Sequence, residues 1–222
     1  MAQPARPPAG NHPTALARAR TLLEHRPGLG LHDDATAPAR WQGGTRVRSS
    51  HASGASMETD MPAELGGSGD RVSPGWLFRA GLASCAATTI ALTAAQRGIA
   101  LDRLEVAAAS RSDTRGLLGM AGADGQPIPA GPSDLTLTVR IAASGVPDEA
   151  LRALVRDCQC LAPTGVAVRD AQPPRLGIER GDPQSLLNAN IFFDFRALAG
   201  DSALAQALRD HVTPRAAAVP RF

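Results

Sequence analysis

A long stretch without any charged side chain, residues 81–95, constrains the fold of this chain more than any other feature. It is shorter than the roughly 20 apolar residues that cross a membrane, but it suits a helix that is buried on nearly all sides. Ser73 is a good N-cap, and Pro74 suits the first helical position, where its missing N–H loses no hydrogen bond. Gly98 suits the end of the helix. We therefore predict one long buried helix over residues 73–98.

Cys85 stands near the middle of this predicted helix, among many small side chains. Small side chains let another backbone approach closely, so we expect tight packing against a helix or a sheet, or against a second subunit. A buried cysteine most often serves only as a small hydrophobic side chain. That structural role is the alternative to any chemistry at Cys85.

A series of motifs precedes the cysteine in a fixed order: Leu65-Gly66-Gly67, Pro74, Leu77-Phe78 and then Cys85. This series resembles the OsmC/Ohr family of thiol peroxidases, in which a Leu-Gly-Gly, a polar loop, a Pro-x-x-Leu-Phe helix start and a run of small residues lead to the reactive cysteine. The resemblance covers about residues 39–179. It implies an α+β fold in which two β-sheets wrap around a long central helix, within an intertwined homodimer.

The resemblance implies reduction of organic hydroperoxides, with Cys85 as the attacking thiol that becomes a sulfenic acid. An external thiol reductant would complete the cycle, and no cofactor is implied. Family members carry an arginine in the preceding hairpin that reaches the thiol; Arg46 is the nearest match and Arg48 the second. A positive partner is required because burial alone raises the pKa of a thiol. The alternative for either arginine is an exposed side chain on a strand.

A second cysteine would resolve the sulfenic acid, and two candidates lie near the end of a predicted helix over residues 147–161. Cys158 belongs to the apolar stripe of that helix, whereas Cys160 would face away from it. The family places this cysteine directly before a proline or one residue away, and here neither of those positions before Pro163 holds one. Either cysteine remains a candidate, and so do a core role for Cys158 and a surface role for Cys160.

A second departure from the family is Gly75. Family members often have a glutamate there, directly after the proline that opens the helix, and this glutamate pairs with the arginine. With glycine at this position the arginine loses that partner. Whether Glu58 or Glu64 takes its place stays open.

Alternating side chains predict strands on both sides of the long helix. Residues 46–48 and 56–61 alternate and indicate a hairpin. Residues 104–108 begin another strand. Residues 134–141 form the clearest strand, because apolar and polar side chains alternate along its whole length.

Three regions are expected along the chain. Residues 1–38 form a flexible extension rich in proline and alanine, in which residues 14–25 suit a short helix. Residues 39–180 form the OsmC-like domain, and residues 181–222 form a helical appendage. The appendage resembles a piece of the C-terminal helical region of nucleotidyltransferases, on Ile191, Phe192, Phe193, Asp194, Arg196, Gly200 and Asp201.

Composition argues against several classes of partner. The net charge of +2 and the absence of tyrosine give no basis for binding nucleic acid or a membrane surface. The three cysteines lack the spacing of metal ligands. No apolar core follows the early arginines, so we expect no signal peptide and a cytoplasmic location.

Four interpretations follow. The first is a hydroperoxide reductase that uses Cys85. The second is a protein of OsmC fold with weak or no turnover, which binds an apolar ligand or acts as a scaffold. The third is a nucleotide-related function carried by residues 181–222, and the fourth is that this segment only mediates association.

Overall fold

The structure is a computed structural model, and it describes residues 12–171, 173–176 and 193–194. The chain divides into two compact units, Met1–Val166 and Ala167–Phe222, and each is described by itself. The predicted boundary at residue 180 lies outside the described residues and stays a prediction.

The first sheet is an antiparallel meander of β1 (Ala39–Gly43), β2 (Arg46–Ser50) and β3 (Ser56–Thr59). The turn between β1 and β2 contains Gly43 and Gly44 with φ of 106° and 55°, a left-handed conformation that glycine adopts without strain. Arg48 pairs with Glu58 across β2 and β3. The predicted hairpin is confirmed, and Arg46 and Arg48 share one face of β2 because side chains alternate along a strand.

The long helix is α2 (Pro74–Gln96), preceded by the short 3₁₀ turn η2 (Ala63–Leu65). The hydroxyl of Ser73 accepts a hydrogen bond from the backbone N–H of Trp76 at 3.2 Å, which is the predicted N-cap. Gly98 has a φ of 70°, as expected of a glycine that ends a helix. The predicted extent of the helix is therefore confirmed.

The expected burial of α2 on nearly all sides is wrong for the single chain. Its buried residues are Leu82, Ile90, Thr93 and Ala94, which form one stripe. The neighbouring elements cover only that stripe and leave the opposite face exposed. Among the described helices α2 alone is long and apolar enough to cross a membrane, a property that core helices share.

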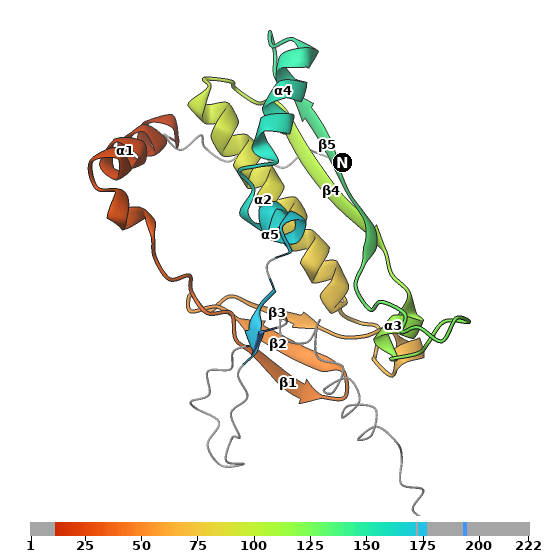
Figure 1. The fold of residues 1–222 in the computed structure, drawn as a ribbon. Helices are drawn as coiled ribbons and strands as arrows, with labels where there is room; N and C mark the ends of the chain where they lie inside the picture. Colours follow the sequence, from red (N-terminus) through yellow and green to blue (C-terminus); the bar gives the residue numbers. More distant parts are fainter. Residues whose placement is uncertain (1–11, 172, 177–192, 195–222) are drawn as a thin grey trace, which may run out of the picture. The chain divides into compact units, whose positions relative to one another are not determined.

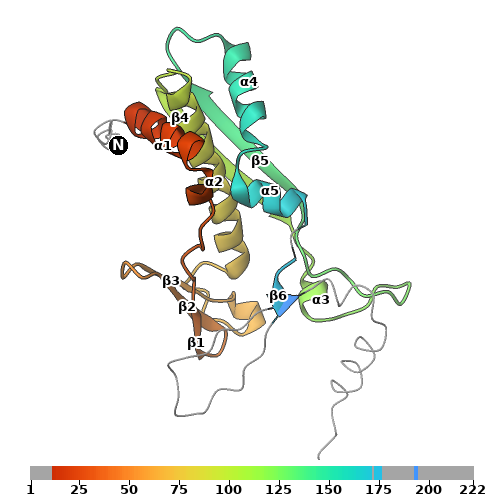
Figure 2. The same cartoon turned by 60° about the vertical axis from the view of Figure 1, so that its left-hand side comes forward.

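The second sheet is an antiparallel pair of β4 (Arg103–Arg111) and β5 (Ser133–Ala142). The helix α3 (Thr114–Leu117) lies in the connection between them, and α4 (Asp148–Cys158) and α5 (Pro163–Arg169) follow. Figures 1 and 2 show α2 running along the β4–β5 pair, with α4 packed against α2. The core lies where these elements meet and consists of Ile90, Ala94, Leu154 and Cys158.

The predicted helix of the N-terminal extension is present as α1 (His12–His25), followed by the 3₁₀ turn η1 (Pro27–Gly30). The helix contacts α2, yet its leucines stay largely open, as the 48% exposed Leu22 illustrates. Such exposure agrees with a loosely docked extension.

The second unit contains two short strands, β6 (Arg175–Leu176) and β7 (Phe193–Asp194), which pair antiparallel. Phe193 and Asp194 belong to the segment expected to be helical, and the backbone of these two residues pairs with β6. The rest of the predicted appendage, within residues 181–222, lies outside the described residues.

Candidate functional site

Cys85 lies at the border between the buried stripe of α2 and its open face. An α-helix turns by about 100° per residue, which places Cys85 about 140° round the axis from Ile90. Phe78 and Leu92 stand seven residues before and after it and therefore within about 20° of its direction. They are 41% and 39% exposed, whereas Cys85 is half-buried. The thiol thus lies on a helix face that is apolar and uncovered in the single chain.

Cys158 lies behind this face, in the core. Its side chain is 3% exposed and packs with Ile90, Ala94 and Leu154. Its Sγ lies 3.9 Å from the backbone oxygen of Thr89, which is one helical turn beyond Cys85. Of the two candidate resolving cysteines, Cys158 therefore contacts the helix that carries Cys85.

Cys160 lies two residues beyond the last residue of α4 and is exposed. The outward direction was expected for a helix that continues to Cys160, and α4 ends before this position, so the exposure of Cys160 has a different cause. Its exposure leaves it accessible to small thiol reagents.

Arg46 is held by carboxylates of the first sheet and of the loop that follows it. Its Nε and Nη2 donate to Oδ2 of Asp60 at 3.3 and 3.0 Å, and Nη2 donates to the hydroxyl of Ser68 at 2.6 Å. Nη2 also pairs with Asp70. Its pKa is raised above the usual value, mainly by the hydrogen bond to Asp60. Within the described residues no hydrogen bond or ion pair joins Arg46 to Cys85.

Asp60 is the buried centre of this arrangement, with 4% of its surface exposed. Its Oδ1 accepts from the Thr45 hydroxyl at 2.5 Å and from the backbone N–H of Met61 at 2.8 Å. Its Oδ2 accepts from the backbone N–H and hydroxyl of Ser68 at 3.2 and 2.6 Å, in addition to Arg46. These donors hold the pKa of Asp60 far below its usual range, with the Ser68 hydroxyl as the largest cause and the Thr45 hydroxyl next.

The ion pairs continue beyond Arg46. Glu58 accepts from Arg48 at 2.5 Å and from Arg71 at 3.0 Å, and Arg71 also pairs with Asp70 at 2.9 Å. We call these six side chains the arginine–carboxylate network: Arg46, Arg48, Glu58, Asp60, Asp70 and Arg71.

The ion pairs of the network show which acids pair with Arg46 in place of the glutamate that the family often has at the position of Gly75. Glu58 binds Arg48 and Arg71 rather than Arg46, and no ion pair of Glu64 occurs in the part of the chain that the structure describes. The partners of Arg46 are Asp60 and Asp70, which sequence reasoning missed. The available signals were weak: Asp60 lies near the end of the strand predicted over residues 56–61, and Asp70 directly follows the loop Gly67-Ser68-Gly69.

Gly75 opens α2 beside Arg79. A Cβ atom at this glycine would lie 3.6 Å from Nη1 of Arg79, an ordinary van der Waals contact. That nitrogen of Arg79 also donates to the hydroxyl of Ser110 on β4 at 3.3 Å. A guanidinium group from Arg79 therefore lies beside the position at which the family often has an acid.

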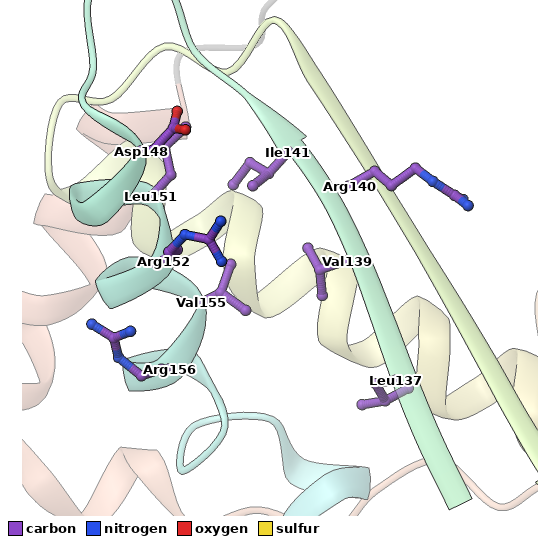
Figure 3. Close-up of a pocket in the computed structure, with 9 residues that line it drawn as sticks. All are labelled: Leu137, Val139, Arg140, Ile141, Asp148, Leu151, Arg152, Val155 and Arg156. Atoms are coloured by element: carbon purple, nitrogen blue, oxygen red, sulfur yellow. The ribbon is translucent and has the colours of Figure 1, made fainter.

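A groove of about 550 Å³ lies between β5 and α4 (Figure 3). Apolar side chains from both elements form its floor: Leu137, Val139, Ile141, Leu151 and Val155. Arg152 extends from α4 toward the strand, whereas Arg140 extends away from α4 on the other side of β5. Neither Cys85 nor Arg46 lines the groove, so it is separate from the thiol.

Comparison with known proteins relates part of this chain to one family. A family model for OsmC-like protein matches residues 67–173, which include all three cysteines and begin after Arg46. An OsmC-like protein from Mycoplasma pneumoniae has a similar structure, with a TM-score of 0.52 at 14% identity, covering 64% of this chain and 92% of that one. This likeness shows the fold alone. No curated protein matches the chain.

Two other solved structures are similar over a comparable length. The organic hydroperoxide resistance protein OsmC from Legionella pneumophila is 23% identical, with a TM-score of 0.47, and the alignment covers 63% of this chain and 91% of that one. The organic hydroperoxide resistance protein OhrB of Bacillus subtilis is 22% identical, with a TM-score of 0.42, and the alignment covers 62% and 91%.

Proposed function

This chain carries an OsmC-like domain, and we propose that it reduces organic hydroperoxides with Cys85 as the attacking thiol. The observation that carries the proposal is the position of Cys85 on the open apolar face of α2, with the Cys158 thiol packed against the same helix. Phe78 and Leu92 give this face the character that suits an alkyl hydroperoxide rather than a small polar one.

The proposed reaction proceeds in three balanced steps. The Cys85 thiolate attacks one oxygen of the peroxide, the O–O bond breaks, and the alkoxide leaves as an alcohol after taking a proton. Cys85 is then a sulfenic acid. The second thiolate attacks its sulfur, a disulfide forms, and the hydroxyl leaves as water. An external thiol reductant then supplies two electrons and two protons to restore both thiols.

Cys158 is our choice for the second thiol. It contacts α2 at Thr89, one helical turn beyond Cys85, whereas Cys160 lies beyond the end of α4 and is exposed. Cys158 is also the last residue of α4, and the final turn of a helix shifts more readily than its interior. Disulfide formation requires such a shift, because Cys158 packs on the Ile90 side of α2 and Cys85 lies about 140° round the helix from Ile90.

The proposal includes a homodimer in a reducing, cytoplasmic setting. In the single chain the face of α2 around Cys85 stays apolar and open, which is typical of a surface that another subunit covers. The family resemblance favours the same arrangement. A reducing compartment is required because the attacking thiol must be returned to its reduced form in every cycle.

Peroxide consumption tests this proposal directly. The protein is supplied with a dithiol reductant and cumene hydroperoxide, and the loss of peroxide is followed for wild type and for Cys85→Ser, Cys158→Ser and Cys160→Ser. We expect Cys85→Ser to abolish turnover, Cys158→Ser to stop it after one oxidation, and Cys160→Ser to behave as wild type. Equal rates in wild type and Cys85→Ser would contradict the proposal.

The groove between β5 and α4 favours a second candidate function, the binding of an apolar ligand without turnover. The ligand that fits is a single-chain amphiphile with an acidic head, because the floor is apolar and Arg152 reaches over it. Asp148 lies at one end of the groove and disfavours a negative charge there.

Calorimetric titration with dodecanoate and with dodecyltrimethylammonium tests this second candidate. We expect the wild-type protein to bind dodecanoate and not dodecyltrimethylammonium, and we expect Arg152→Gln to lose the binding of dodecanoate. Arg140→Gln is the comparison variant, since Arg140 also lines the groove but its guanidinium donates to Glu105 on β4 at 3.0 Å. Equal binding of both amphiphiles, or none, would count against it.

The functions expected of residues 181–222, nucleotide binding or association, stay predictions because nearly all of that segment lies outside the described residues. Titration with nucleotides tests the first of them, and the oligomeric state of a chain ended after residue 181 tests the second.

A further inference from the structure

A second pocket, with a volume of about 350 Å³, lies on the hairpin of β1 and β2. Its lining residues come from both strands and from the residue just before β1: Pro38, Arg40, Gln42, Arg48 and Ser50. The polar side chains among them all carry hydrogen-bond donors, namely two guanidinium groups, an amide and a hydroxyl, and none of the five is an acid. Such a lining favours an anion.

The register of the two strands brings the arginines together. Arg40 stands directly opposite Arg48 in the pairing of β1 with β2. Like charges in opposite positions destabilise a sheet, and an anion bound between them would remove that repulsion. Ser50 shares the face of Arg48 because side chains alternate along a strand. The backbone N–H of Ser50 donates to the carbonyl of Pro38 at 3.0 Å, which fixes this end of the pocket.

The charges around the pocket leave one arginine unbalanced. The arginine–carboxylate network contains three arginines and three carboxylates, so it is neutral by itself. Arg40 adds a positive charge, and its side chain makes no hydrogen bond or ion pair within the described residues. Arg48 uses Nε and Nη2 on Glu58 at 3.1 and 2.5 Å, which leaves Nη1 for a ligand. Glu58 divides its charge between Arg48 and Arg71.

We propose that this pocket binds the phosphate group of an organic monophosphate. Such a group carries about two negative charges near neutral pH, and its three terminal oxygens can accept from both arginines and the Ser50 hydroxyl together. Guanidinium groups bind phosphate through paired hydrogen bonds. A carboxylate has one charge and two oxygens, so it fits this set of donors less well. The proposal is independent of the hydroperoxide chemistry at Cys85.

Calorimetric titration of the full chain tests this proposal. The probes are glycerol 3-phosphate, glycerol and acetate, and the proteins are wild type, Arg40→Gln, Ser50→Ala and Arg103→Gln. Arg103→Gln is the matched control, because Arg103 is an arginine on β4 with a 68% exposed side chain and does not line the pocket. Vesicles of phosphatidylcholine, with and without phosphatidic acid, present the same phosphate group as a lipid headgroup.

We expect wild type to bind glycerol 3-phosphate more tightly than acetate and not to bind glycerol. Arg40→Gln is expected to weaken the binding of glycerol 3-phosphate by about tenfold, since it removes a charged donor. Ser50→Ala is expected to weaken it by about fivefold without changing the charge of the pocket. Arg103→Gln is expected to keep the wild-type affinity. Vesicle binding that requires both phosphatidic acid and Arg40, without binding of glycerol 3-phosphate, would identify a lipid as the source of the phosphate group.

Several outcomes overturn the inference. Equal losses in Arg40→Gln and Arg103→Gln would mean that phosphate responds only to the overall charge of the protein. Equal affinities for acetate and glycerol 3-phosphate would contradict phosphate as the ligand class. Absence of binding to every phosphate probe, together with a change of mass in sedimentation velocity for Arg40→Gln, would mean that an acidic group of a second copy fills the pocket instead.

Discussion

Arg46 and Arg48 lie two residues apart on the same face of β2, yet their partners give them different roles. Arg46 is 29% exposed and bound to the buried Asp60, whereas Arg48 is 51% exposed and bound to Glu58. An exposed pair of the second kind contributes little to stability. The structure therefore favours Arg46 as the arginine that is held in one orientation.

Substitution of the two arginines tests this difference. Arg46→Gln is expected to slow peroxide reduction by about tenfold or more, because the family resemblance assigns to this arginine the positive charge that favours the thiolate of Cys85. Arg48→Gln is the matched control on the same strand and should change the rate by less than about twofold. The measurement is the second-order rate constant with cumene hydroperoxide. A larger loss of rate in Arg48→Gln than in Arg46→Gln would mean that Arg48, and not Arg46, is the arginine required for peroxide reduction.

Acid stability provides a further test at the residue scale. The pKa of Asp60 is depressed in the folded chain, so its contribution to stability is complete above its unfolded pKa of about 3.9 and is lost as the pH falls below that value. Wild type should therefore lose stability below about pH 4 more steeply than Asp60→Asn. Urea unfolding at pH 7 and pH 3 measures this. Parallel losses in the two proteins would contradict the assignment of Asp60 as an ionised anchor.

The partners of Arg46 show which features of the site could not be predicted from the sequence. The series from Leu65 to Cys85 predicts the helix, its N-cap and its thiol, because caps and motif spacing are local properties of the chain. Asp60 and Asp70 become partners of Arg46 only when the loop between β3 and α2 folds back over the hairpin. No local pattern encodes that contact, which joins residues 14 and 24 positions apart.

At the scale of elements, α2 and α4 meet through a small core. Leu154 is 0% exposed and contacts the stripe of α2 that contains Ile90 and Ala94. The periodicity of α4 predicted this apolar face and the position of Cys158 within it. The degree of burial of α2 was not predictable in the same way, because the sequence shows that a helix is apolar but not how many of its faces the single chain covers.

Truncation of the core leucine measures this packing. Leu154→Ala is expected to lower the free energy of unfolding by about 2–5 kcal/mol, since it leaves a cavity between the two helices. Leu161→Ala, at a position that is 58% exposed, should change it by less than about 0.5 kcal/mol. Urea unfolding of both variants provides the comparison. Similar values for the two would mean that α4 does not pack on α2 as described.

At the scale of the whole molecule, the Cys85 thiol lies on a face of α2 that a second subunit would cover in the proposed homodimer. Phe78 and Leu92 flank Cys85 on this face and are exposed in the single chain. Cover from a second copy would remove apolar surface from water and would place the thiol in a low-polarity environment. The proposed homodimer thus links the burial of α2 to the choice of an organic substrate.

A charge placed on this face tests the proposed dimer. Leu92→Glu is expected to convert the dimer to a monomer, because a carboxylate would be buried without a partner. Leu29→Glu, at a site that is 56% exposed outside α2, is the matched control and should leave the dimer intact. Sedimentation velocity reports the masses. A dimeric Leu92→Glu variant would mean that this face is not the interface.

The oxidation state of Cys85 after brief exposure to an organic hydroperoxide is the most direct test of the proposed chemistry. Intact mass and peptide mapping are compared for wild type and Cys85→Ser. We predict a disulfide between Cys85 and Cys158 in wild type, and no oxidation of the remaining cysteines in the variant. A wild-type protein that keeps all three thiols reduced under these conditions would contradict the hydroperoxide reductase and leave ligand binding as the better explanation.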